Sequence, residues 1–87
     1  MKWQLKYSDD AERQLRKIDP IWAKRIRGYM DNKVLTAAHP KDLGKALTGD
    51  LSGHYRYRIG DYRVICELHE EVLLVWVVEA GHRKNIY

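Results

Sequence analysis

Residues 55–64 constrain the fold of this 87-residue chain more than any other segment. Two short runs that alternate between aromatic or aliphatic residues and charged ones meet at Gly60-Asp61. A Gly/Asp pair between alternating runs is typical of a tight β-hairpin. A two-residue turn places Arg58 directly opposite Arg63 and thereby fixes every other pair in the hairpin. The chain is therefore predicted to contain at least two antiparallel strands in a defined register.

That register sorts the hairpin side chains onto two faces, because successive residues of a strand point to opposite sides. One face is mostly aromatic and suits a core, whereas the other is positively charged. Like charges opposite one another destabilise a strand pair, so the charged face is expected to bind an anion. The first set is Tyr55, Tyr57, Ile59, Tyr62 and Val64, and the second is His54, Arg56, Arg58 and Arg63.

The segment before the hairpin predicts a strand and two helices. Residues 3–7 alternate as a half-buried strand does. Ser8 is placed to cap a helix that ends near Ile18, and Asp19-Pro20 is typical of the start of a second helix, which runs to Val34. The two helices should form a hairpin that packs on one face of the sheet.

Residues 38–53 contain Pro40 and three glycines and are expected to form a connecting loop, on which Lys41 and Lys45 could reach a phosphate. Residues 72–78 are apolar throughout and predict a last strand covered on both faces. The fold class is therefore α+β, in the order strand-helix-helix-strand-strand-strand, with a largely antiparallel sheet. A two-residue turn before the last strand would put Leu74, Trp76 and Val78 on the face of the arginines.

Composition favours one domain, residues 1–87, with a net charge of +4 and a pI near 9.3. This charge suits nucleic acid, an anionic surface or an acidic partner protein. The single cysteine, Cys66, excludes an internal disulfide and fits a reducing cytoplasm as a small buried residue. The N-terminus lacks the apolar core of a signal peptide, and the longest apolar run is too short for a membrane helix. The four histidines are scattered, so we expect no metal site and no cofactor.

In length, element order and several motifs, the chain resembles the RelE/ParE superfamily of toxins from type II toxin–antitoxin pairs. No single motif is decisive, but their order along almost the whole chain is fairly specific. The residues that carry the resemblance are Lys45-Ala-Leu47, Leu51-Ser-Gly53, the hairpin Gly53–Arg63, the apolar strand, Gly81-His82-Arg83 and the closing Ile86-Tyr87.

The resemblance implies a RelE-like, microbial-ribonuclease-like fold and two possible activities. Toxins of the RelE branch cleave mRNA in the ribosomal A site, whereas those of the ParE branch inhibit DNA gyrase and generally lack the cleavage residues. The positions that match the family's catalytic residues are Arg56, Arg58, Arg63, Arg83 and Tyr87, and these favour a metal-independent endoribonuclease. Further substrate contacts are expected from His54, His82, Lys84 and Lys45.

The resemblance also implies partners: a RelB-like antitoxin, the ribosome with its mRNA, and operator DNA only through the toxin–antitoxin complex. A gyrase inhibitor and a non-catalytic RNA- or ribosome-binding module remain alternatives. Arginines suit the stabilisation of phosphate charge, but they give up a proton poorly. The general base is therefore left open among Tyr87, His54 and His82.

Overall fold

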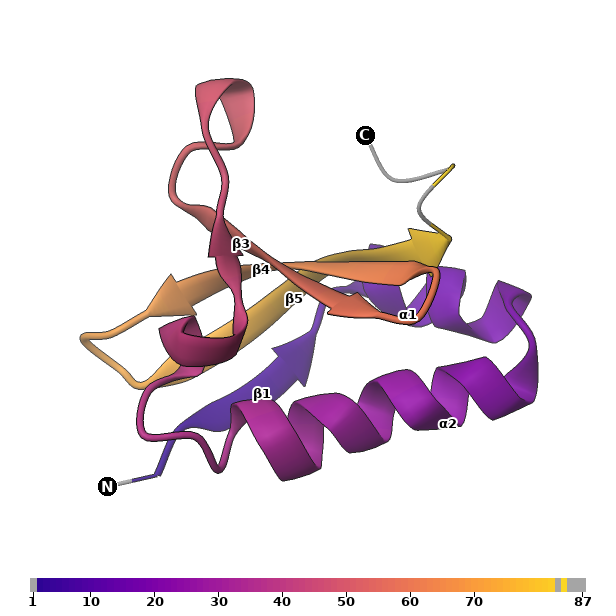
Figure 1. Ribbon diagram of the computed structural model, residues 1–87, viewed down its shortest axis with the longest axis horizontal. Helices are drawn as coiled ribbons and strands as arrows, with labels where there is room; N and C mark the ends of the chain where they lie inside the picture. Colours follow the sequence, from indigo (N-terminus) through magenta and orange to yellow (C-terminus); the bar gives the residue numbers. More distant parts are fainter. Residues whose placement is uncertain (1, 83, 85–87) are drawn as a thin grey trace.

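The computed structural model describes residues 2–82 and 84 and has an α+β fold in which two helices cover one face of a five-stranded sheet (Figure 1). A short 3₁₀ turn also forms at Pro40–Leu43 and another at Gly49–Leu51. The regular elements are β1 Gln4–Tyr7, α1 Asp9–Lys17, α2 Pro20–Tyr29 with a π-helical turn Met30–Val34, β2 Lys45–Ala46, β3 His54–Ile59, β4 Tyr62–His69 and β5 Leu74–His82.

The sheet has the order β1-β5-β4-β3-β2, with β1 parallel to β5 and all other pairs antiparallel. The expectation that residues 38–53 form only a loop was wrong, because Lys45–Ala46 adds an edge strand to β3. The backbone N–H of Leu47 also donates to His54 O at 2.9 Å. These bonds satisfy the outer edge of β3, a need that no side-chain pattern displays.

Helix boundaries follow the predicted capping residues. Ser8 Oγ accepts a hydrogen bond from Ala11 N at 3.0 Å, and Asp19 Oδ1 accepts one from Ile21 N at 2.8 Å. These side chains satisfy N–H groups that have no partner within the first turn of a helix. The apolar sides of both helices then pack on the sheet, where the fully buried core residues include Ile26, Met30, Tyr57, Val64, Val75 and Val77.

The hairpin register was predicted correctly, with Ile59 opposite Tyr62 and Arg58 opposite Arg63. The last strand differs from its predicted range, since β5 begins at Leu74 rather than at Val72 and continues to His82. Residues 70–73 form the turn before it, where Leu73 has a φ of 52° and Val72 is 63% exposed. In the part of the chain that the structure describes, no helix is long and apolar enough to span a bilayer.

Candidate active site

The face of the sheet that points away from the helices carries Arg56, Arg58 and Arg63 and is called the arginine face below. β3 supplies the first two side chains and β4 the third, and Arg58 lies directly opposite Arg63. Arg58 is exposed, while Arg56 and Arg63 are half-buried. Three guanidinium groups on one sheet surface form a site that can bind phosphate oxygens through paired N–H groups.

The tip of the hairpin is held in place from the helical side. Gly60 has a φ of 59°, and a Cβ atom there would lie 2.6 Å from the ring of Trp22 in α2. The Trp22 ring in turn lies 5.1 Å from that of Tyr62, and the guanidinium of Arg25 lies 5.0 Å from its centre. This contact fixes the turn and, through it, the pairing of the arginines on the other side of the sheet.

His54 lies at the far end of the arginine face, where a carboxylate contacts one of its ring nitrogens and the other is buried. Its Nε2 atom lies 3.3 Å from Glu67 Oε2, and its Nδ1 atom is buried with no hydrogen-bond partner among the described residues. The same carboxylate contacts His69 Nε2 at 2.9 Å. Lys45, in contrast, is exposed and lies opposite Arg56 across β2 and β3, where it extends the positive charge.

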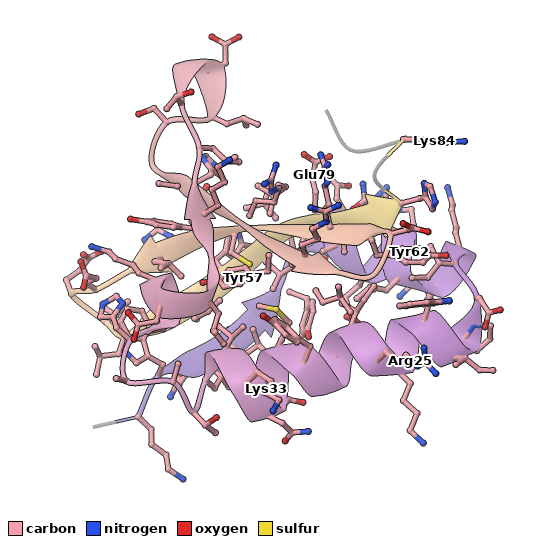
Figure 2. The ribbon with its side chains drawn as sticks, viewed as in Figure 1. Arg25, Lys33, Tyr57, Tyr62, Glu79 and Lys84 are labelled. Atoms are coloured by element: carbon pink, nitrogen blue, oxygen red, sulfur yellow. The ribbon has the colours of Figure 1, made fainter. Side chains whose placement is uncertain are left out.

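A carboxylate, Glu79, also lies on the arginine face, and sequence reasoning missed it. Cys66 pairs with Val77, but Ile65 pairs with Glu79, so β5 contains one extra residue at this point. Such a β-bulge reverses the alternation that follows it. Strict alternation from Trp76, which lies opposite Glu67, would have turned Glu79 toward the helices. Figure 2 shows Glu79 on the side of the sheet opposite Lys33 and Arg25.

Glu79 and Arg56 occupy the same row of the sheet on either side of Ile65. Ile65 is 0% exposed although it lies on the face without helices. Strands are spaced about 4.8 Å apart, which puts the backbones of Arg56 and Glu79 about 9.6 Å apart. The site thus combines a cationic surface with a half-buried acid above an apolar floor.

The end of β5 brings the chain back to the arginines, as expected. Gly81 lies opposite Arg63, and His82 lies opposite Tyr62. The next predicted residue, Arg83, lies outside the described residues, as does Tyr87. Lys84 is exposed, and its backbone N–H donates to His82 Nδ1 at 3.2 Å.

His82 is not on the arginine face. Its ring makes an edge contact with that of Tyr62, 5.5 Å away, on the side of the sheet that the helices cover. There it lines a cleft of about 420 Å³ between the end of α1 and the end of β5. The cleft is lined by Gln14, Lys17, Ile18, Asp19, Tyr62, Ala80, Gly81 and His82 and contains none of the three arginines.

Two other reactive side chains are structural. Tyr57 is 0% exposed and donates to Pro40 O at 2.6 Å, and burial raises the pKa of its phenol. Burial likewise raises the pKa of the Cys66 thiol, which is also 0% exposed. Both groups stay protonated at neutral pH and face the core, so neither serves as a base or nucleophile. Within residues 2–82 and 84, no three His, Cys, Asp or Glu side chains are arranged to hold a metal ion.

The sequence of this chain is similar to those of known toxins. Residues 5–87 match the family described as the ParE toxin of the type II toxin–antitoxin system parDE. The toxin RelG of Mycobacterium tuberculosis is 25% identical over 87 residues, which cover 100% of this chain and 98% of RelG.

Solved structures share the fold at lower sequence identity. The toxin–antitoxin complex RelBE2 from Mycobacterium tuberculosis matches with a TM-score of 0.87 and 23% identity, over 95% of this chain and 100% of the matched chain. The archaeal RelE–RelB complex from Pyrococcus horikoshii OT3 matches with a TM-score of 0.72 and 22% identity, over 99% and 100%. These likenesses confirm the predicted RelE-like architecture.

Proposed function

Since the chain belongs to the ParE toxin family and is a type II toxin of the RelE/ParE superfamily, we propose that it is a ribosome-dependent endoribonuclease that cleaves mRNA in the A site. The observation that carries this proposal is the direct pairing of Arg58 with Arg63 beside the half-buried Arg56 on an open sheet face. A scaffold that binds no anion gains nothing from such a pair, because like charges opposite one another destabilise the strands that bear them.

The proposed reaction is attack of a ribose 2′-hydroxyl on the adjacent phosphate. It requires removal of the hydroxyl proton, stabilisation of the additional negative charge on phosphorus, and protonation of the departing 5′-oxygen. Arg56, Arg58 and Arg63 serve the second requirement, since positioned charges of this kind are each worth about 10²–10³ in rate. By resemblance to the family, Arg83 adds a fourth guanidinium, and Tyr87 contacts the reacting nucleotide or stacks on a base.

The proposed substrate contacts outside the catalytic set fall into two groups. Lys45 and His54 lie on β2 and β3 beside the arginines and suit contacts to the RNA backbone. His82 faces the cleft on the helical side, so its proposed contact is with a nucleotide that passes the end of the sheet. Lys84, exposed just beyond β5, suits a phosphate of the same strand or of the ribosome.

We propose a RelB-like antitoxin as the protein partner. Structures with the same fold include RelE toxins in complex with their RelB antitoxins. An acidic, amphipathic segment that orders on binding fits the charge of the arginine face and blocks access to it. Operator DNA is contacted only through this complex, and the toxin acts in the cytoplasm, where its ribosomal target is found.

The second candidate function is inhibition of DNA gyrase, which the description of the matched family as ParE toxins favours. It predicts that the arginine face binds a protein or DNA without any bond being broken. The two functions share a fold and a partner, so only activity separates them. A third alternative, an RNA- or ribosome-binding module, predicts tight binding with neither activity.

Primer extension on mRNA from purified translating ribosomes tests the proposal. Wild type should produce A-site cuts, and Arg63→Ala should reduce the cleavage rate about 10²–10³-fold. Lys33→Ala removes one positive charge from the helical side and should cleave like wild type (Figure 2). Arg83→Ala and Tyr87→Phe complete the series as variants of the two residues assigned by resemblance.

A gyrase supercoiling assay runs in parallel with the same preparations. Intact mRNA together with blocked supercoiling would select the gyrase inhibitor and overturn the endoribonuclease. Ribosome binding without cleavage or supercoiling inhibition would select the binding module. Equal cleavage by wild type and Arg63→Ala would show that the arginine face takes no part in the proposed reaction.

A further inference from the structure

We infer that Glu79 is the general base that accepts the proton of the attacking 2′-hydroxyl, an inference that rests on the endoribonuclease proposed above. The arginines supply positive charge but bind their protons too tightly to act as bases. The reaction therefore needs one more titratable group within reach of the same phosphate. The bulge in β5 brings a carboxylate to this face of the sheet, where alternation alone would have turned it away.

The position of Glu79 relative to the arginines fits this role. Gly81 lies opposite Arg63, and Glu79 lies two residues earlier on the same strand and the same face. Two residues of a strand span about 6.8 Å, a gap that a ribose bridges when its phosphate is bound by Arg63 and Arg58. Glu79 is half-buried, so its carboxylate is partly removed from water but still open to a substrate.

The other titratable groups on the described part of this face are already engaged. Glu67 lies between His54 and His69 at 3.3 and 2.9 Å, and the free nitrogen of His54 is buried. His82 points to the helical side, where it contacts Tyr62. Glu79 has none of these engagements in residues 2–82 and 84, which leaves it as the carboxylate best able to meet a ribose hydroxyl.

The proposed step moves one proton and exchanges one bond at phosphorus. The O–H bond of the 2′-hydroxyl breaks as its proton passes to the Glu79 carboxylate, and the 2′-oxygen forms a bond to phosphorus. The bond between phosphorus and the 5′-oxygen breaks, and water protonates that oxygen. The products are a 2′,3′-cyclic phosphate and a 5′-hydroxyl, after which the carboxyl group returns its proton to solvent.

Glu79→Gln tests the inference, because the amide keeps the size of the side chain but cannot accept the proton. Cleavage should fall about 10²–10⁴-fold, the range for loss of a general base. Affinity for ribosomes programmed with mRNA that carries a 2′-O-methyl group at the cut site should stay equal or rise, since a negative charge near the phosphate is removed. Glu79→Asp should keep part of the activity, and Glu71→Gln, in the exposed turn before β5, is the matched control.

The pH profile separates a base from a structural acid. The acid limb of kcat/KM should be lost in Glu79→Gln, and the melting temperature should be close to that of wild type. Charged groups near Glu79 contribute to the profile and are changed singly in the same assay. Those on the same face of the sheet are Arg56 and Arg58 on β3, Arg63 and Glu67 on β4 and Lys6 on β1, and Lys84 lies just beyond β5.

Each of the following results overturns the assignment of Glu79 as the general base. Cleavage by Glu79→Gln at the wild-type rate overturns the inference and leaves the endoribonuclease intact. A slow variant that keeps the acid limb, or that melts well below wild type, assigns Glu79 a structural role and also overturns it. A wild-type protein that cleaves no RNA refutes the proposed function itself, and the inference with it.

Discussion

Arg58 and Arg63 lie directly opposite one another at the end of the β3–β4 hairpin, one pair before the turn that Gly60 and Asp61 form. Two cations held at this spacing repel each other, and the free protein carries that repulsion as an internal instability. A phosphate bound between them turns the same arrangement into a favourable one. The pair therefore couples phosphate binding to the stability of the fold, and a single variant allows both to be measured.

Arg58→Gln should stabilise the ligand-free protein by about 0.2–1 kcal/mol while it lowers cleavage. The gain should shrink as salt rises, because the repulsion between exposed charges is screened. Urea denaturation at low and high salt measures it. Lys33→Gln, which removes an equal charge from the helical layer, should change stability little. A variant less stable than wild type at low salt would show that the two guanidinium groups do not repel.

Gly60→Ala should destabilise the protein more than Gly49→Ala does, although both residues have positive φ, 59° and 67°. Each variant pays about 1–2 kcal/mol for the left-handed backbone. At Gly60 the new methyl group also overlaps the Trp22 ring, which should add about 1–3 kcal/mol, whereas nothing lies within 4 Å of the equivalent position at Gly49. Thermal or urea denaturation provides both values. Equal losses of stability in the two variants would contradict the close contact between Trp22 and the turn.

Tyr57→Phe should destabilise the protein by about 1–3 kcal/mol, because it leaves Pro40 O buried without the hydrogen bond that Tyr57 donates at 2.6 Å. Tyr7→Phe is the matched control. The Tyr7 hydroxyl is buried without a hydrogen-bond partner in the described part of the chain, and burial raises its pKa to about 12. Its removal should be neutral or slightly stabilising in the same denaturation experiment. The reverse order of the two variants would refute this assignment.

Glu70→Gln should reduce stability at neutral pH and have no effect in strong acid. The hydrogen bond from His39 at 2.7 Å, with Lys41 nearby, lowers the pKa of the Glu70 carboxyl from 4.5. A folded-state pKa below the unfolded one adds stability above the unfolded value, and that stability is lost as pH falls through the folded value. Urea curves of both proteins between pH 7 and pH 3 should therefore converge below about pH 4.5. Asp50→Asn, in the exposed 3₁₀ turn, should track wild type, and curves that stay parallel would contradict the assignment.

Binding of the cognate antitoxin should raise the melting temperature of the toxin well above that of the free chain. A ligand present at a thousandfold excess over its dissociation constant stabilises the folded state by about 4 kcal/mol. Differential scanning calorimetry on the free toxin and on the co-purified complex measures the shift. Equal melting temperatures would contradict a partner that binds only the folded state.

The sequence predicted those features that rest on local chemistry. The Gly60-Asp61 turn allows few registers, so the pairing of Arg58 with Arg63 followed from two residues. Ser8 and Asp19 were readable as caps, because a short polar side chain before an apolar helix has few other uses. The core position of Tyr57 followed from the same alternation that put the arginines on the opposite face.

Features set by contacts between distant segments were not predictable in this way. The edge strand Lys45–Ala46 exists because β3 offers unpaired backbone groups, and two residues carry no periodicity. The bulge in β5 lies among consecutive valines, whose side chains are equally acceptable on either face, so Glu79 could not be assigned to the arginine face. The predicted roles of Arg83 and Tyr87 fall outside the described residues and stay predictions.

The extra residue in β5 has a consequence for how such toxins diverge. Inserting or deleting a single residue in an apolar strand exchanges which later side chains reach the arginine face, yet it alters no core contact upstream. A chain of this fold can thus acquire or discard an acid beside its arginines without mutating any of them. Relatives that look equivalent when aligned on their valines can differ in chemistry. The residue on the arginine face is identified more securely by its position two residues before the glycine opposite Arg63.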